Sequence, residues 1–315
     1  MSTSPATAHQ GERPSASPVL AVGVDQGGRS TGAVVWAAEE AERAGCELHL
    51  VTATHTSAPS EAEREQVRSG LVGMARSLEL TEVSCEVREG PTHDVLLAAA
   101  EDARMLVVGR RGFGSVHRLV VGSVSLALAG EAEIPVVVVP EQWLQPSRSS
   151  APIVLGLDPD CFHGPLAPGV ADPEHEALVF ACQRAARMRV PLIVVSSAPV
   201  LPPHRHGSAY AAHQRAADAQ RLAERITPWR QAWPEVEMVA RSSDLPAGRA
   251  LLEAGQPAQL TVLGRHSSLP APGRRPGSTS AHVLRHSTHP LAIVPLSTPW
   301  HPVRSPSTST PKEQS

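Results

Sequence analysis

The stretch from Met105 to Pro140 reads MLVVGRRGFGSVHRLVVGSVSLALAGEAEIPVVVVP, and the order of its patterns decides the fold. A short apolar run ends at Gly109, a loop containing glycine follows, a Gly-Ser pair opens a helical segment, and a run of valines closes the stretch. That order predicts a strand, a loop, a helix and a second strand. Near-continuous Val and Leu runs are typical of strands covered on both faces, so a parallel sheet flanked by helices is predicted.

Three of the glycines in this stretch, Gly109, Gly112 and Gly122, have with Ser123 the spacing G-x2-G-x9-G-S. Glycine permits backbone angles or close approaches that a Cβ forbids, and Ser123 is expected to be the N-cap of the helix. A helix N-terminus presents unpaired N–H groups and a positive dipole end, so the loop suits an anion such as phosphate. The structural alternative is a tight turn between strand and helix.

The loop is not a Walker A motif, which needs a lysine directly before its Ser or Thr. Lys312, near the C-terminus, is the only lysine in the chain. The loop carries Arg110 and Arg111 instead, and these could either approach a phosphate or remain in solvent.

With this spacing, the stretch resembles the nucleotide-binding signature of universal stress proteins, in the branch that binds ATP. Asp25, at the end of VLAVGVD, matches the aspartate with which that family contacts adenosine, and REGPTHDVLLAAAEDARMLVVG resembles the usual lead-in. The resemblance implies an adenine nucleotide alpha hydrolase-like α/β fold, with ATP, with or without Mg²⁺, as the ligand. It also implies the contacts. Asp25 would hydrogen-bond the adenosine, Val24 and Leu50 would lend backbone and apolar contacts, and the phosphates would be held by Gly109, Arg111, Gly112, Gly122, Ser123, Val124 and Ser125.

The first half of the chain alternates predicted strands and helices. Strands are expected over about residues 19–24, 47–52, 83–87, 105–108 and 136–139, and helices over about residues 31–44, 60–78, 94–103 and 123–129. This alternation indicates a doubly wound α/β sheet, in which ligands bind beyond the carboxyl ends of the strands at the switch in strand order. Asp25 and Gly109 both lie at the carboxyl ends of such strands.

The pattern repeats after residue 150. Asp158 ends IVLGLD as Asp25 ends AVGVD, and later positions repeat at one constant offset: Gly264, Gly277, Ser278, Pro290 and Pro295 correspond to Gly109, Gly122, Ser123, Pro135 and Pro140. This register indicates a duplication, and two tandem, mainly parallel five-stranded sheets flanked by helices are expected. The expected divisions are a disordered tail over 1–16, domains over 17–140 and 151–296, a linker over 141–150 and a second tail over 297–315.

The second copy departs from the first at its loop, where Ser267 stands at the position of Gly112, and at an insertion after its first strand. If that position needs a positive φ, serine costs about 1 kcal/mol there, and its Cβ crowds an approaching phosphate. The second site, comprising Asp158, Gly264, Gly277 and Ser278, is therefore expected to be degenerate.

The composition of the chain argues against several other functions. A formal net charge of -3 disfavours nucleic acid and anionic lipid as partners, and no stretch is apolar enough for a membrane span. Four cysteines without paired spacing indicate reduced thiols in a cytoplasmic protein. His204 and His206 have no carboxylate or cysteine at ligand spacing, so no metal site is predicted.

Two function classes remain open. The first is a regulatory or stress-survival module whose nucleotide state is read by an unknown protein partner. The second is an enzyme that weakly hydrolyses ATP or phosphorylates itself in the same pocket. The first is favoured because the loop offers groups to hold phosphate but no identifiable base, and no catalytic residue is assigned.

The valine run between Pro135 and Pro140 and the run between Pro290 and Pro295 occupy equivalent positions. An open apolar edge strand is an aggregation hazard that has to be paired or covered. Universal stress proteins, which this chain resembles, often meet through this strand. The resemblance therefore implies that the two halves pack as a pseudo-symmetric intramolecular dimer, with pairing to a second chain as the alternative.

Overall fold

The computed structural model describes residues 18–25, 29–54, 60–80, 83–110, 121–141, 143, 150–158, 173–197, 208–265 and 276–295. Arg111, Gly112 and Ser267 lie outside these residues, as do His204, His206, Cys161, both predicted tails and most of the predicted linker.

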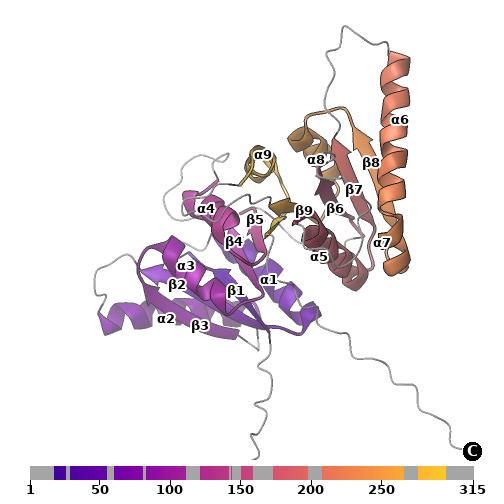
Figure 1. Cartoon of the computed structure of the whole chain (residues 1–315). Helices are drawn as coiled ribbons and strands as arrows, with labels where there is room; N and C mark the ends of the chain where they lie inside the picture. Colours follow the sequence, from indigo (N-terminus) through magenta and orange to yellow (C-terminus); the bar gives the residue numbers. More distant parts are fainter. Residues whose placement is uncertain are drawn as a thin grey trace, which may run out of the picture.

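The first half has the predicted alternation of strands and helices (Figure 1). Its elements are β1 (Val19–Gly23), α1 (Thr31–Ala44), β2 (Glu47–Thr54), α2 (Glu61–Ser77), β3 (Val83–Glu89), α3 (Thr92–Glu101), β4 (Met105–Gly109), α4 (Ser123–Glu131) and β5 (Val136–Val139). The helix α1 and the strand β5 have the predicted bounds, whereas β2 and β3 each continue two residues further because they pair with each other up to Thr54 and Glu89.

The second half repeats this order with one additional helix among the described residues. Its elements are β6 (Ile153–Leu157), α5 (Pro173–Met188), β7 (Leu192–Ser197), α6 (Ser208–Arg225), α7 (Thr227–Ala232), β8 (Met238–Ser243), α8 (Ala247–Gly255), β9 (Leu260–Arg265), α9 (Ser278–His286) and β10 (Leu291–Pro295). The helix after the insertion begins at Pro173.

The two five-stranded parallel units are joined edge to edge into one ten-stranded sheet, in the order β3-β2-β1-β4-β5-β10-β9-β6-β7-β8. The joint between β5 and β10, here called the seam, is antiparallel, while the other neighbouring strands are parallel. Val137 lies opposite Ala292, and these are equivalent positions of the two copies. A pseudo-twofold axis therefore passes between them, and the predicted meeting of the two halves within one chain is confirmed.

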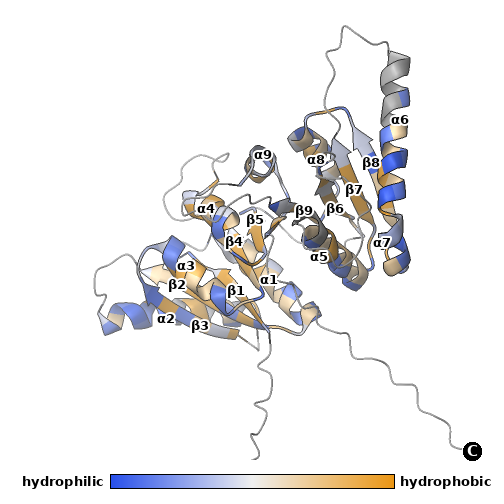
Figure 2. Cartoon of the chain, in the orientation of Figure 1, coloured by the Kyte–Doolittle hydropathy of each residue, from blue (hydrophilic) through white to orange (hydrophobic). Residues whose placement is uncertain are grey.

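Helices cover both faces of the sheet. One apolar cluster packs α1, α2, α5, α6 and α7 against one face, and a second packs α3, α4, α8 and α9 against the other. Figure 2 shows the central strands as mainly hydrophobic, while hydrophilic residues are frequent in α2 and in the coloured part of α6. The largest fully buried side chains include Trp36 of α1 and Trp229 of α7, both in the first cluster.

The cysteines that the structure describes are not disulfide-bonded: Cys46 and Cys182 are buried and Cys85 is partly buried. Burial raises the pKa of the Cys182 thiol far above its ordinary value, which keeps it protonated. Within the described part of the chain, no helix combines the length and apolar character needed to cross a membrane.

His289 is a buried polar side chain in the turn that leads into β10. Its Nε2 lies 2.7 Å from Thr261 Oγ1, and its carbonyl accepts a hydrogen bond from Ser287 Oγ at 2.6 Å. Burial lowers the pKa of His289 from 6.5 to about 4, because the imidazolium form loses its hydration there. The folded state therefore binds fewer protons than the unfolded state between these two values.

We expect this histidine to make the protein less stable as the pH falls from about 6.5 to about 4. Its stabilising contribution is complete above the unfolded pKa and is lost towards the folded pKa, and the loss approaches roughly 3 kcal/mol. Urea unfolding at a series of pH values should show a shallower acid dependence for His289→Gln than for the unmodified protein. His213→Gln, at an exposed position of α6, should leave the profile unchanged.

Candidate functional site

The first candidate site lies where the carboxyl ends of β1 and β4 meet. These strands are parallel neighbours, with Gly23 opposite Val108, so the chain leaves both at the same edge of the sheet. The strand β1 also pairs with β2 on its other side, which makes β1 and β4 the pair between which the strand order switches. Ligands bind at this point in open α/β sheets, and the prediction that Asp25 and Gly109 share this edge is confirmed.

Asp25 is fixed by Ser30, the residue before α1. Asp25 Oδ1 accepts hydrogen bonds from the Ser30 backbone N–H at 2.8 Å and from Ser30 Oγ at 2.7 Å. The Asp25 backbone N–H donates in turn to Ser30 Oγ at 3.0 Å. Ser30 is buried, so these bonds form in a setting where water competes little. They hold the carboxylate at the strand end and position the start of α1.

Val24 is held by the neighbouring strand. Its N–H donates to the Val51 carbonyl at 2.9 Å, and its carbonyl accepts a hydrogen bond from Thr52 Oγ1 at 2.7 Å. Leu50, by contrast, has no exposed surface and lies opposite Val22 inside the sheet. Because β2 continues to Thr54, Leu50 lies in the middle of the strand, and its predicted contact with the ligand stays a prediction.

The helix α4 begins at Ser123, as predicted, but Ser123 is not its N-cap. Its N-cap is Gly122, with φ -60° and ψ 142°, and no side chain among the described residues caps the helix. The prediction that Ser123 is the N-cap is therefore wrong. Gly122 is the boundary residue because its N–H donates to the Arg110 carbonyl at 2.8 Å while its carbonyl accepts the Leu126 N–H at 3.1 Å. Since this φ is open to any residue, Gly122 is not required for its backbone angle.

The first turn of α4 faces the end of β4. The N–H groups of Ser123, Val124 and Ser125 precede the first intrahelical hydrogen bond, so they are the groups of this helix that can receive an anion. Ser125 is buried and its Oγ donates to the Gly109 carbonyl at 2.8 Å, which ties the helix to the strand end. Ser123 is exposed and Val124 partly exposed.

Arg110 has a structural contact in the other half of the chain. Its Nη1 donates to the Ser287 carbonyl at 2.6 Å, at the C-terminal end of α9. A cation at the carbonyl end of a helix is favourable, so this contact stabilises the seam. Arg111 and Gly112 lie outside the described residues, and their predicted contacts with phosphate stay predictions.

The second half has the same framework. Asp158 directly follows β6, Gly264 lies in β9, and these two strands are parallel neighbours. Gly277 is the N-cap of α9 with φ -55° and ψ 164°, and a Cβ built on it meets no atom within 4 Å. Ser278 is exposed at the first helical position. The substitution expected to impair this site, Ser267, lies outside the described residues.

Sequence reasoning found the strand ends but missed the residues that hold them. Ser30 and Thr52 are both buried hydroxyl side chains that fix Asp25 and Val24. Ser30 stands directly before a predicted helix, a position where serine is common as an N-cap, and its pairing with Asp25 could have been inferred from that signal. Thr52 carried no such signal, because a threonine near the end of a strand is ordinary.

A family model and protein relatives indicate the same protein family, and a solved structure from that family has the same fold. The model of the universal stress protein family matches residues 19–140 and 170–295. A universal stress protein of Mycolicibacterium smegmatis is 29% identical over 300 residues, covering 87% of this chain and 96% of that protein. One of Mycobacterium tuberculosis is 29% identical over 309 residues, covering 87% and 94%. The crystal structure of a universal stress protein from Archaeoglobus fulgidus superposes with a TM-score of 0.62 at 15% identity, covering 89% and 99%.

We expect Asp25 and Ser30 to act as one stabilising unit. Asp25→Ala and Ser30→Ala should each lower the free energy of unfolding by about 1–3 kcal/mol, and the double variant should lose much less than the sum. Ser123→Ala is the matched control, since its exposed hydroxyl caps nothing, and it should change stability by no more than about 0.5 kcal/mol. Urea unfolding measures all four proteins, and additive losses would show that the two side chains do not interact.

Proposed function

Because this chain belongs to the universal stress protein family, we propose that its first half binds ATP and acts as a nucleotide-dependent regulatory or stress-survival module. The observation that carries the proposal is the convergence of Asp25, the end of β4 and the first turn of α4 at the switch in strand order. A carboxylate there can accept hydrogen bonds from a sugar hydroxyl, while helix N–H groups a short way along the same edge can receive phosphate.

The groups at this edge suit a polyphosphate. Gly122 places no side chain before the start of α4, and the exposed Ser123 adds a hydroxyl donor beside the helix N–H groups. Each charge-assisted hydrogen bond contributes about 1.5–3 kcal/mol before desolvation and ordering costs, so micromolar affinity is reasonable. Mg²⁺ would accompany the phosphates as part of the ligand.

We assign binding to the first half because the second copy carries serine where the loop of the first has Gly112. Gly277, the N-cap of α9, has nearly the same backbone angles as Gly122, the N-cap of α4. We therefore expect the two sites to differ in the loop. About one ATP per chain is proposed.

Regulation is proposed rather than turnover. Among the described members of the predicted contact set, Asp25 is the one titratable side chain, and one of its oxygens already accepts two hydrogen bonds from Ser30. Hydrolysis needs a group that orients or deprotonates the attacking water, and none is identified among those residues. The read-out would then be a protein partner that distinguishes the occupied from the empty state.

Calorimetric titration with ATP tests the proposal, together with analysis of nucleotide retained by protein purified without added ligand. Gly122→Val should weaken ATP binding at least tenfold, because its side chain stands before the helix N–H groups while its backbone angles suit valine. Gly277→Val is the matched control at the equivalent position of the second copy, and it should leave both affinity and stoichiometry unchanged.

Three outcomes would contradict parts of this proposal. Absence of ATP binding by the folded, unmodified protein would reject the function, and equal effects of the two valine variants would reject the assignment to the first half. Phosphate release from ATP, or a gain in protein mass from phosphate after incubation, would favour the weak ATPase or self-phosphorylating alternative. Both enzymatic signals should be lost in Gly122→Val if they arise in this pocket.

A further inference from the structure

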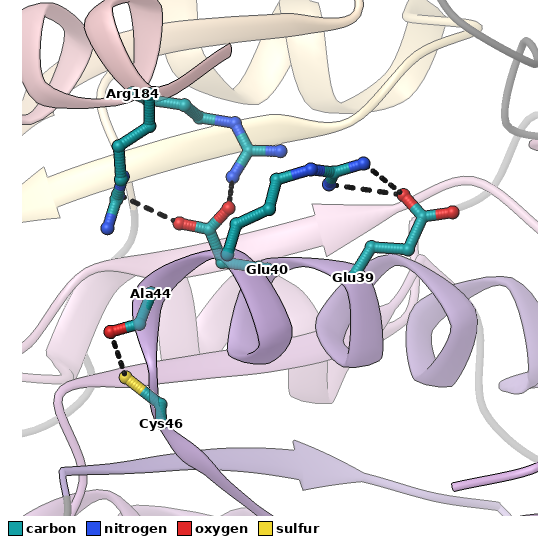
Figure 3. Close-up of polar contacts among 7 residues, drawn as sticks. Glu39, Glu40, Ala44, Cys46 and Arg184 are labelled. Atoms are coloured by element: carbon teal, nitrogen blue, oxygen red, sulfur yellow. Dashed lines mark hydrogen bonds and ion pairs between the residues drawn. The ribbon is translucent and has the colours of Figure 1, made fainter.

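Two oppositely charged side chains meet in the interior where α1 and α5 pack over the seam. Glu40 of α1 is 2% exposed and Arg184 of α5 is 3% exposed, so both are nearly inaccessible to water. Arg184 Nη1 donates a hydrogen bond to Glu40 Oε2, and Arg187 Nη2 donates to Glu40 Oε1 at 2.9 Å. Figure 3 shows Glu40 rising from α1 towards Arg184, with both of its carboxylate oxygens engaged. One carboxylate from the first half thus binds two guanidinium groups from the second.

These charged residues occupy equivalent positions of the duplicated fold. Each helix ends at a residue in the left-handed region, Gly45 with φ 62° after α1 and Arg189 with φ 54° after α5. The backbone closes both ends in the same way, since Cys46 N–H donates to the Ala41 carbonyl at 2.9 Å and Val190 N–H to the Ala185 carbonyl at 3.1 Å. Glu40 directly precedes Ala41 and Arg184 directly precedes Ala185.

The neighbouring residues follow the same equivalence. Trp36 and Phe180 stand at matching positions and both are buried. The guanidinium carbon of Arg184 lies 4.5 Å from the centre of the Trp36 ring, so the aromatic side chain of the first half also contacts the cation of the second. The pseudo-twofold axis between Val137 and Ala292 relates α1 to α5. Val137 and Ala292 both belong to the apolar cluster that contains these two helices.

We propose that the buried pair of Glu40 and Arg184 makes this interface specific for unlike halves. It favours packing of a first half on a second half and disfavours packing of two first halves or of two second halves. In a symmetric pair of first halves, position 40 would face position 40, and two carboxylates would be buried together, with Arg43 at the position equivalent to Arg187. In a symmetric pair of second halves, two arginines would meet, with Arg187 adding further positive charge. Buried like charges are strongly unfavourable, so both like pairs are disfavoured relative to the unlike pair.

This arrangement determines what a second copy of the chain can do. Apolar strand edges such as β5 and β10 pair readily with any similar edge, and backbone hydrogen bonds alone do not distinguish one partner from another. The buried charges supply that distinction. Burial and the nearby charge of Arg187 lower the pKa of Arg184 to about 9, so the arginine is still charged near neutral pH and needs an anion opposite it. A second chain can then pair only by a reciprocal exchange of halves.

Charge exchange in the full-length chain tests the proposal. Glu40→Arg and Arg184→Glu, each alone, place like charges together in every possible pairing and should lower the melting temperature by about 10 °C. When these two variants are refolded together, each offers the charge that the other lacks. We expect a complex that contains one chain of each variant, with twice the mass of the monomer and a melting temperature closer to that of the unmodified protein.

The double variant Glu40→Arg with Arg184→Glu decides the case even if the single variants do not fold. Carrying both charges in one chain, it should be a monomer that recovers at least half of the lost melting temperature, the remainder reflecting the position of Arg187 and the lost contact with Trp36. Glu42→Arg, the same charge change at an exposed position of α1, is the control and should behave as the unmodified protein. Three results would overturn the proposal: no recovery of melting temperature in the double variant, an unchanged melting temperature in the single variants, or a single variant that forms dimers by itself as readily as the mixture does.

Discussion

Two apolar strand edges that cannot be left open to water determine the architecture of this chain. The edges β5 and β10 are buried along their whole length, and each is covered by the other. Since the strands are equivalent members of a duplication, pairing them antiparallel with Val137 opposite Ala292 imposes a pseudo-twofold relation on everything nearby. The packing of α1 beside α5 on one face and of α4 and α9 on the other follows from that single registration.

A duplicated fold in one chain differs physically from a dimer of identical chains, because equivalent positions can carry different residues. At the seam this freedom allows an acid at one position and a base at its equivalent, which no symmetric homodimer can have. The buried pair formed by Glu40 and Arg184 is costly to desolvate and a weak source of net stability compared with an apolar pair. Its value lies in the difference between correct and incorrect partners, since breaking the pair leaves a buried charge without compensation.

The sequence predicted the strands and the duplication, because these depend on periodicity and on spacing at a constant offset. The resemblance to universal stress proteins implied the pairing of the two edge strands. The sequence did not predict which residue is the N-cap of α4, since Ser123 and Gly122 are both good N-caps and the choice depends on the hydrogen bond from Gly122 to Arg110. It ended β2 two residues too early, because β2 gains those residues from pairing with β3, a tertiary effect. The partner of Glu40 was likewise invisible, although a charge on an apolar helix face at equivalent positions of both copies was a signal.

Arg110 belongs both to the candidate site and to the seam. Its carbonyl accepts the Gly122 N–H at 2.8 Å, and its own N–H donates to the Val139 carbonyl at 2.8 Å, so its backbone links β4, β5 and the start of α4. Its side chain meanwhile reaches Ser287 in the other half. An anion at the start of α4 would therefore lie next to Gly122, whose hydrogen-bond partner Arg110 also links the two halves through its side chain. Because a packed seam resists small continuous deformation, a shift at this residue has to be absorbed either in the loop that begins at Arg110 or in the contact with Ser287.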